Sequence, residues 1–84
     1  MEKDIKAVIL MLATQSMINL GEIQDPMSGD QKNDFEGARA FMELIDVLEQ
    51  KTKGNLTPEE SRFLTEVKDN LTKVYYKKLN KNPG

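Results

Sequence analysis

The chain of 84 residues contains no histidine, no cysteine and no tryptophan. Without histidine and cysteine it cannot form a zinc finger, a disulfide framework or a catalytic triad that depends on an imidazole or a thiol. Acid–base catalysis would have to rest on carboxylates and lysines alone. We therefore expect a protein that is not an enzyme and that binds no metal ion or cofactor.

Proline and glycine are also scarce, with three and five residues respectively, so little in the chain interrupts a helix. Leucine, isoleucine, valine and phenylalanine make up about a quarter of the residues, which is above the level at which chains stay disordered. A chain of this length supports one hydrophobic core. We predict a single all-α domain over residues 1–84.

The spacing of apolar residues predicts three helices, over about residues 2–20, 34–53 and 58–79. A loop at 21–33 and a turn at 54–57 separate them, and residues 80–84 are expected to fray. Ile23 and Met27 should hold the loop against the core. The second and third helices should form an antiparallel hairpin, with the first helix packed across them and onto a partner subunit.

The expected helix ends carry capping signals. Gly21 and Gly54 are placed where a left-handed residue ends the first and second helices. Asp30 or Asn33 is the expected N-cap of the second helix. The third helix has the strongest start signal, a capping box with proline at the first helical position. Its residues are Thr57, Pro58 and Glu60.

The first helix contains an uninterrupted apolar run over residues 7–13. The run is far shorter than the ~20 residues that cross a bilayer, so we expect no membrane span. It is at the lower limit for a signal peptide, and the residues before it carry no net positive charge. We therefore expect a cytoplasmic protein.

The same run predicts self-association. Because it is apolar around most of its circumference, one partner face within a three-helix monomer would not cover it. We predict a homo-oligomer, most simply a dimer, and a non-enzymatic interaction protein whose other partner is unknown. The expected interface consists of Ile5, Val8, Ile9, Met11 and Leu12.

The second helix is predicted to have a wide apolar face and an acidic one. Gly37, Ala40, Leu44 and Val47 form a stripe that widens its apolar face beside Ala38 and Ile45. Its acidic residues have the spacing of a di-metal site but lack the accompanying histidines, so they are expected to be solvated. They are Glu36, Glu43, Asp46 and Glu49.

The junction between the second and third helices is a candidate anion or partner site. Two lysines, a glycine turn and the start of a helix resemble a phosphate cradle. The same residues also suit a purely structural corner, and the sequence does not decide between the two. They are Lys51, Lys53, Gly54, Asn55 and Thr57.

The third helix ends in a basic segment, although the net charge of the whole chain is −2. Only one of Tyr75 and Tyr76 can face the core, so the other is exposed beside lysines. Exposed aromatic rings among lysines suit the stacking of bases next to phosphates. An accessory RNA- or ribosome-associated protein is therefore the second hypothesis. Its candidate patch is Lys73, Tyr76, Lys77 and Lys78.

Four segments together resemble one bacterial family of small proteins, the domain of unknown function numbered eighteen-forty-four. They are 19–22, 25–29, 38–48 and 49–60, of which Lys51 to Thr57 is the most specific. One departure is that Lys73-Val74 stands before the final tyrosines, where the family tends to carry an arginine. The resemblance covers nearly the whole chain. It implies a short helical protein and assigns no activity or catalytic residue.

Overall fold

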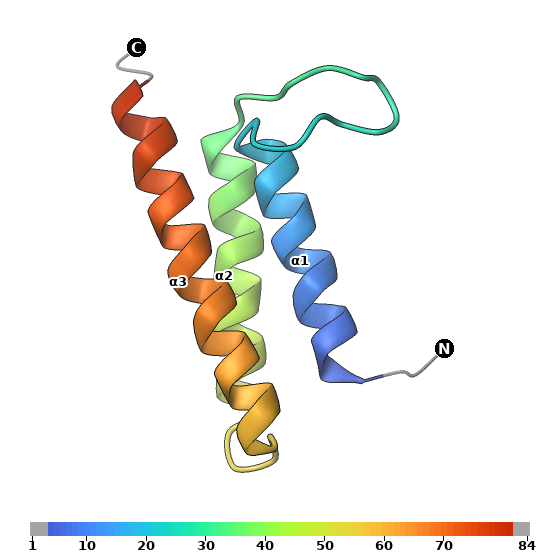
Figure 1. Cartoon of the computed structure of the whole chain (residues 1–84), viewed down its shortest axis with the longest axis vertical. Coiled ribbons are helices and arrows are strands. Elements are labelled where there is room, and N and C mark those ends of the chain that lie inside the picture. Colours follow the sequence, from blue (N-terminus) through green and yellow to red (C-terminus); the bar gives the residue numbers. More distant parts are fainter. Residues whose placement is uncertain (1–3, 82–84) are drawn as a thin grey trace.

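The computed structural model describes residues 4–81 and consists of three helices. They are α1 (Ile5–Asn19), α2 (Phe35–Lys51) and α3 (Pro58–Lys81). The chain runs up α1, down α2 and up α3, so α2 is antiparallel to both neighbours (Figure 1). The all-α prediction with α2 and α3 as an antiparallel hairpin is confirmed.

The two termini differ from the predicted helix boundaries. The predicted helical residues 2–3 and the predicted frayed residues 82–84 lie outside the described part of the chain. Asn80 and Lys81, which were expected to fray, belong to α3. Lys78 and Lys81 lie in the last turn of this helix, where positive charge complements the exposed carbonyl groups.

The first helix is capped at both ends. The Asp4 carboxylate accepts the backbone N–H groups of Lys6 at 2.7 Å and Ala7 at 3.3 Å. At the other end Gly21 adopts φ = 78°, and its N–H donates to the Ile18 carbonyl at 3.0 Å. The next N–H, that of Glu22, donates to the Met17 carbonyl at 2.9 Å, which completes a Schellman motif.

The N-cap of α2 is Asp34 and not Asp30 or Asn33. Its carboxylate accepts the Gly37 N–H at 2.8 Å, while its own N–H donates to the Asn19 carbonyl at 2.8 Å. Asp30 is instead part of the preceding loop, because its carbonyl accepts the N–H of Asp25 at 2.9 Å. This pairing closes the loop before the helix begins.

The junction between α2 and α3 contains the predicted capping box. The Thr57 N–H donates to the Glu60 carboxylate at 2.8 Å, and the Glu60 N–H donates to the Thr57 hydroxyl at 3.1 Å. Gly54 has φ = 86°, but it lies two residues beyond Thr52, the C-cap of α2. The left-handed residue therefore shapes the connecting turn rather than the last turn of the helix.

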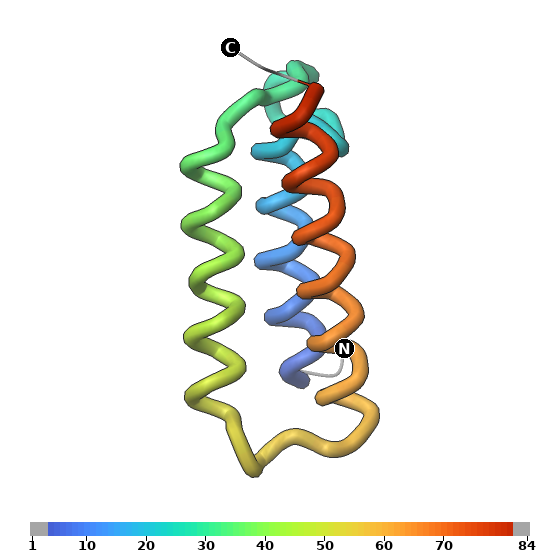
Figure 2. The backbone as a smooth tube through the Cα atoms, turned by 90° about the vertical axis from the view of Figure 1, so that its left-hand side faces the viewer, coloured from blue at the N-terminus to red at the C-terminus, as the bar shows by residue number. Residues whose placement is uncertain are grey.

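The core joins all three helices around α1. Its buried apolar residues are Ile9, Ala13, Ile45, Leu64 and Leu71. Ser16 of α1 and Ala38 of α2 are completely buried, and their small side chains allow these helices to approach closely. Contact between α2 and α3 is the least extensive of the three helix pairs. In Figure 2, α1 lies behind the space between α2 and α3.

The loop between α1 and α2 projects from one end of the bundle (Figure 1). Met27 is 92% exposed, so the prediction that it holds the loop against the core is wrong, whereas Ile23 is 43% exposed and lines a cavity beside Ala13 and Leu71 of the core. The loop instead closes on itself. The Asp25 carboxylate accepts the Met27 N–H at 2.9 Å, and the Gln24 side chain donates to the Gly29 carbonyl at 2.9 Å.

Among residues 4–81, no helix has the length and apolar character that crossing a membrane requires.

Candidate interaction surfaces

The residues predicted as an oligomer interface on α1 fall into two groups. Ile9 is completely buried within the single chain, and Ile5 and Leu12 pack against the same core. Ile9 is therefore not accessible to a partner chain, because it packs in the core against α2 and α3. Val8 is 39% exposed and Met11 is 59% exposed, so these two residues of the set are open to a second chain.

The exposure of Val8 and Met11 follows from the composition of α1. Lys6 is the one charged residue between Ile5 and Asn19, and it pairs with Glu59 of α3 at 2.9 Å. Because α1 carries apolar side chains on nearly every side, those that do not belong to its core-facing stripe remain exposed to solvent. Leu10, 57% exposed, lies on the flank of α1 nearest α3, beside a cavity of about 210 Å³ that Ile23 and Val67 also line.

Two exposed apolar residues on α2 were expected to widen its core face. Leu44 is 49% exposed and Val47 is 48% exposed. They lie on the side of α2 away from the buried Ala38 and Ile45, and Ala40 is exposed with them. The stripe is therefore a surface feature of the single chain.

Val8 and Leu44 border the seam between α1 and α2, and Met11, Ala40 and Val47, each three or four residues away on the same helix, lie farther out from it. Gly37 and Asn19 are in contact there, since a Cβ atom on Gly37 would lie 2.9 Å from Nδ2 of Asn19. Val8 is three helical turns from Asn19 and Leu44 is two turns from Gly37, so each lies on the seam edge of its helix. In the antiparallel course Val8, eleven residues before Asn19, is level with Val47, about one turn beyond Leu44. We call the exposed apolar surface formed by Val8, Met11, Ala40, Leu44 and Val47 the α1–α2 face.

The residues of the α2–α3 corner do not converge on one site. The hydroxyl and N–H of Thr57 are both used in the capping box, which also places the Glu60 carboxylate at the start of α3. Glu59 adds a second carboxylate to the same turn. An anion at this helix start would therefore meet two negative charges, which argues against a phosphate cradle.

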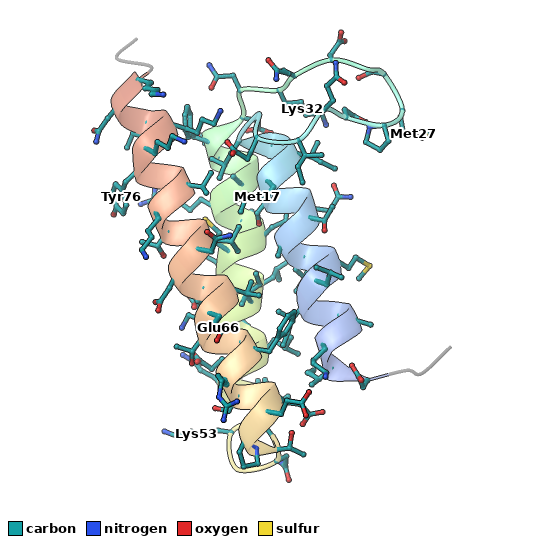
Figure 3. All side chains as sticks on the ribbon, in the orientation of Figure 1. Met17, Met27, Lys32, Lys53, Glu66 and Tyr76 are labelled. Atoms are coloured by element: carbon teal, nitrogen blue, oxygen red, sulfur yellow. The ribbon has the colours of Figure 1, made fainter. Side chains whose placement is uncertain are left out.

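The remaining corner residues point to different places. Lys53 and Gly54 line a hollow of about 400 Å³ together with Glu49 and Leu56. Lys51 is not among the residues that line this hollow. Asn55 is exposed and its N–H donates to the Thr52 carbonyl at 2.9 Å. Figure 3 shows Lys53 at the opposite end of the molecule from Met27 and Lys32.

The basic patch on α3 is smaller than predicted. Tyr75 packs edge-on against Phe35 of α2, with ring centroids 5.8 Å apart, while Tyr76 is 57% exposed. Figure 3 shows Tyr76 pointing away from the bundle. Lys73 is exposed one helical turn before Tyr76 and on the same side of α3, and Lys77 is exposed one turn after Lys73, on the side of Lys73 away from Tyr76.

Lys78 does not belong to the basic patch. It lies on another face of α3, where its ammonium group pairs with the Glu22 carboxylate at 3.2 Å. The helical rotation of about 100° per residue places Lys78 nearly opposite Tyr76, about 160° around the helix. The patch therefore consists of Lys73, Tyr76 and Lys77.

Two acidic residues of α2 that were expected to be solvated instead bind a lysine of α3. Lys68 donates to the Glu49 carboxylate at 2.6 Å and pairs with Asp46 at 3.2 Å. The hydrogen bond with Glu49 raises the pKa of Lys68 above its ordinary value. Beside these groups a groove of about 260 Å³ separates α2 from α3, with Met42, Ile45 and Leu71 in its lining.

No cluster of three or more acidic side chains suited to a metal ion occurs within residues 4–81.

A family model described as "Domain of unknown function (DUF1844)" matches residues 2–77. This range contains α1, α2 and most of α3, and therefore the whole α1–α2 face. No curated protein and no solved structure matches the chain.

Proposed function

Since the chain belongs to the DUF1844 family, whose description assigns no activity, we propose a function from its surfaces. We propose that it is a cytoplasmic, non-enzymatic interaction module that self-associates through the α1–α2 face. The proposal is carried by the exposure of Val8, Met11, Leu44 and Val47, which the helical rotation places on the sides of α1 and α2 next to their shared seam.

The physical argument is the removal of apolar surface from water. Each of these four side chains keeps roughly 40 to 60% of its surface exposed in the single chain. Contiguous apolar surface of this kind marks an interaction site more often than isolated exposed residues do. The α1 part of the face has no charged side chain, so a second copy could cover it without removing an ion from water.

The non-enzymatic part of the proposal is supported by where the perturbed titratable groups lie. The pKa of Lys6 is raised and that of Glu59 is lowered mainly by the hydrogen bond that joins them on the surface. Lys68 likewise serves an ion pair between helices. Such pairs explain the shifts as structural, whereas catalytic groups are usually perturbed within a cleft beside a substrate site.

The oligomeric state and a pair of matched variants test the proposal. We expect sedimentation equilibrium to show a dimer at tens of micromolar protein, and a strict monomer would contradict it. Met11→Asp should abolish the dimer while the helical circular dichroism is retained, because Met11 is 59% exposed. Leu10→Asp is the control, since Leu10 is equally exposed at 57% but lies on the flank of α1 nearest α3.

An accessory RNA-binding role is the second candidate, and the exposure of Tyr76 between Lys73 and Lys77 favours it. We expect fluorescence anisotropy at low salt to detect binding of single-stranded RNA that weakens steeply with salt. Lys73→Gln with Lys77→Gln should weaken this binding more than Lys78→Gln, since Lys78 is engaged by Glu22. No binding at low salt would remove this candidate.

A further inference from the structure

The outer surface of α2 carries a stripe with opposite charges at its two ends. Its members are Glu36, Ala40, Leu44, Val47 and Lys51, all of them exposed. Steps of four, four, three and four residues keep them on one side of the helix. The outer stripe of α2 is therefore acidic at its start, apolar in its middle and basic at its end.

The two end charges cannot satisfy each other within one chain. Glu36 and Lys51 are 15 residues apart on a single helix, a distance of about 22 Å. Neither takes part in an ion pair within the described residues 4–81. A partner surface that complements the stripe must be basic opposite Glu36 and acidic opposite Lys51.

A second copy of the stripe meets this requirement in one orientation. We propose that two chains pair through their α2 helices in an antiparallel arrangement, about a two-fold axis that passes beside Leu44. This inference rests on the proposed self-association. Glu36 of each chain then lies opposite Lys51 of the other, Ala40 lies opposite Val47, and Leu44 meets its own copy.

The charge pattern excludes the parallel alternative. With parallel helices in register, Glu36 would lie opposite Glu36 and Lys51 opposite Lys51, so both ends would repel. The antiparallel pair places one like-charged contact near its axis, where Glu43 approaches its own copy at the edge away from α1. Arg39, one turn earlier on the same edge of α2, offsets this charge.

The neighbouring helix extends the contact. Met11 is about level with Leu44, and Val8 is about one turn farther along, level with Val47, so α1 flanks the stripes when they meet. Ala40 and Val47 supply a small residue opposite a larger one on either side of the axis. The dimer therefore buries the whole α1–α2 face, with α2 at its centre rather than α1.

Charge reversal at the two ends tests the arrangement. E36K or K51E alone replaces two attractive contacts per dimer with two repulsive ones, and we expect the dimer to weaken about tenfold. The double variant E36K/K51E should restore the original dissociation constant. Intrachain effects cannot produce this rescue, because the two residues are too far apart within α2.

Mixing the two single variants gives an independent measurement. The E36K chain carries two lysines on its stripe and the K51E chain carries two glutamates, so a mixture should form heterodimers in preference to either homodimer. Native mass spectrometry of a mixture in which one variant is isotope-labelled would measure the ratio of heterodimer to homodimer. Glu66→Lys, at an exposed position of α3 that is not part of the outer stripe of α2 (Figure 3), is the control and should leave the dimer unchanged.

The outcomes separate this inference from the proposed function. A dimer in which the single variants change nothing, or the double variant fails to recover, would overturn the antiparallel pairing and leave self-association standing. A strict monomer would overturn both. Cysteine crosslinking decides the register in addition, since the natural chain has no cysteine. Leu44→Cys should crosslink to itself, whereas Ala40→Cys should crosslink only when mixed with Val47→Cys.

Discussion

Lys68 of α3 reaches across to α2, where its ammonium group lies 2.6 Å from the Glu49 carboxylate and 3.2 Å from that of Asp46. This is the ionic connection between the two helices that contact each other least. The lysine side chain is 34% exposed, so solvent screens the attraction. The pair therefore contributes little to stability.

Replacing Lys68 by methionine should lower the free energy of unfolding by less than about 1 kcal/mol, since half-exposed ion pairs are weak. The expected decrease in the free energy of unfolding is larger at low salt, because at high salt screening already weakens the ion pair in the unmodified protein. Chemical denaturation at two salt concentrations measures both quantities. Lys73→Met is the control, since Lys73 is exposed and makes no ion pair within the described residues.

Removing the capping hydroxyl of α3 should destabilise the protein measurably. Thr57→Ala deletes the acceptor of the Glu60 N–H, and we expect the free energy of unfolding to fall by about 1 kcal/mol. Thr65→Ala is the matched control, because its hydroxyl binds the Ser61 carbonyl in the middle of the same helix, where no cap is lost. Equal effects of the two substitutions would contradict the capping argument.

Two glycines with similar backbone angles should differ in their tolerance of alanine. Gly21 has φ = 78°, and a Cβ atom there would lie 2.5 Å from the Lys32 carbonyl oxygen. Gly29 has φ = 76° but no atom within 4 Å of such a Cβ. We expect Gly29→Ala to lower the unfolding free energy by about 1 kcal/mol and Gly21→Ala by more than about 2 kcal/mol. Thermal denaturation of the two variants would rank them.

The Asp25 carboxyl should titrate below its ordinary range. The N–H of Met27 lowers the pKa of Asp25 most, and the Lys32 ammonium group, 3.3 Å away, lowers it further. Because the folded pKa is depressed, the charged carboxylate stabilises the loop above the ordinary pKa of about 3.9. This contribution is lost as the pH falls through the lower folded value.

Carbon-13 NMR titration of the Asp25 carboxyl measures its pKa in the folded protein directly. The Met27 amide signal, followed in the same titration, reports on the hydrogen bond between the two residues. Lys32→Met should reduce the shift without removing it, since the backbone N–H of Met27 is the largest single cause. A pKa at or above the ordinary value would show that the loop is not closed in solution.

The helices and their caps were largely predictable because their signals are local. The Thr57–Glu60 capping box and the left-handed Gly21 depend on a few neighbouring residues, and the structure has both. The N-cap of α2 was predicted wrongly although its start was predicted to within a residue, since Asp30, Asn33 and Asp34 all suit an N-cap. The choice of Asp34 depends on its N–H bonding to Asn19, a contact between distant parts of the chain.

The surfaces were harder to predict because they depend on which flank of a helix its neighbours cover. On α1, Ile9 and Met11 are both apolar, yet the packing of α2 and α3 buries the first and leaves the second exposed. On α2, Leu44 and Val47 lie next to the core stripe in the sequence pattern, but the packing leaves about half of each side chain exposed. The attachment of Lys68 to Glu49 had no local signal, because the two residues belong to different helices.

The central place of α1 also bears on how the chain folds. Because α2 and α3 meet mainly through the first helix, a nascent chain that has produced only α1 and α2 already holds the tighter helix pair, joined at Asn19 and Asp34. The last helix then has a preformed surface on which to dock. We expect the transition state for refolding to contain the α1–α2 pair, with α3 still largely unbound. Substitutions at Ala38 should therefore slow folding, whereas substitutions at Leu64 should mainly speed unfolding.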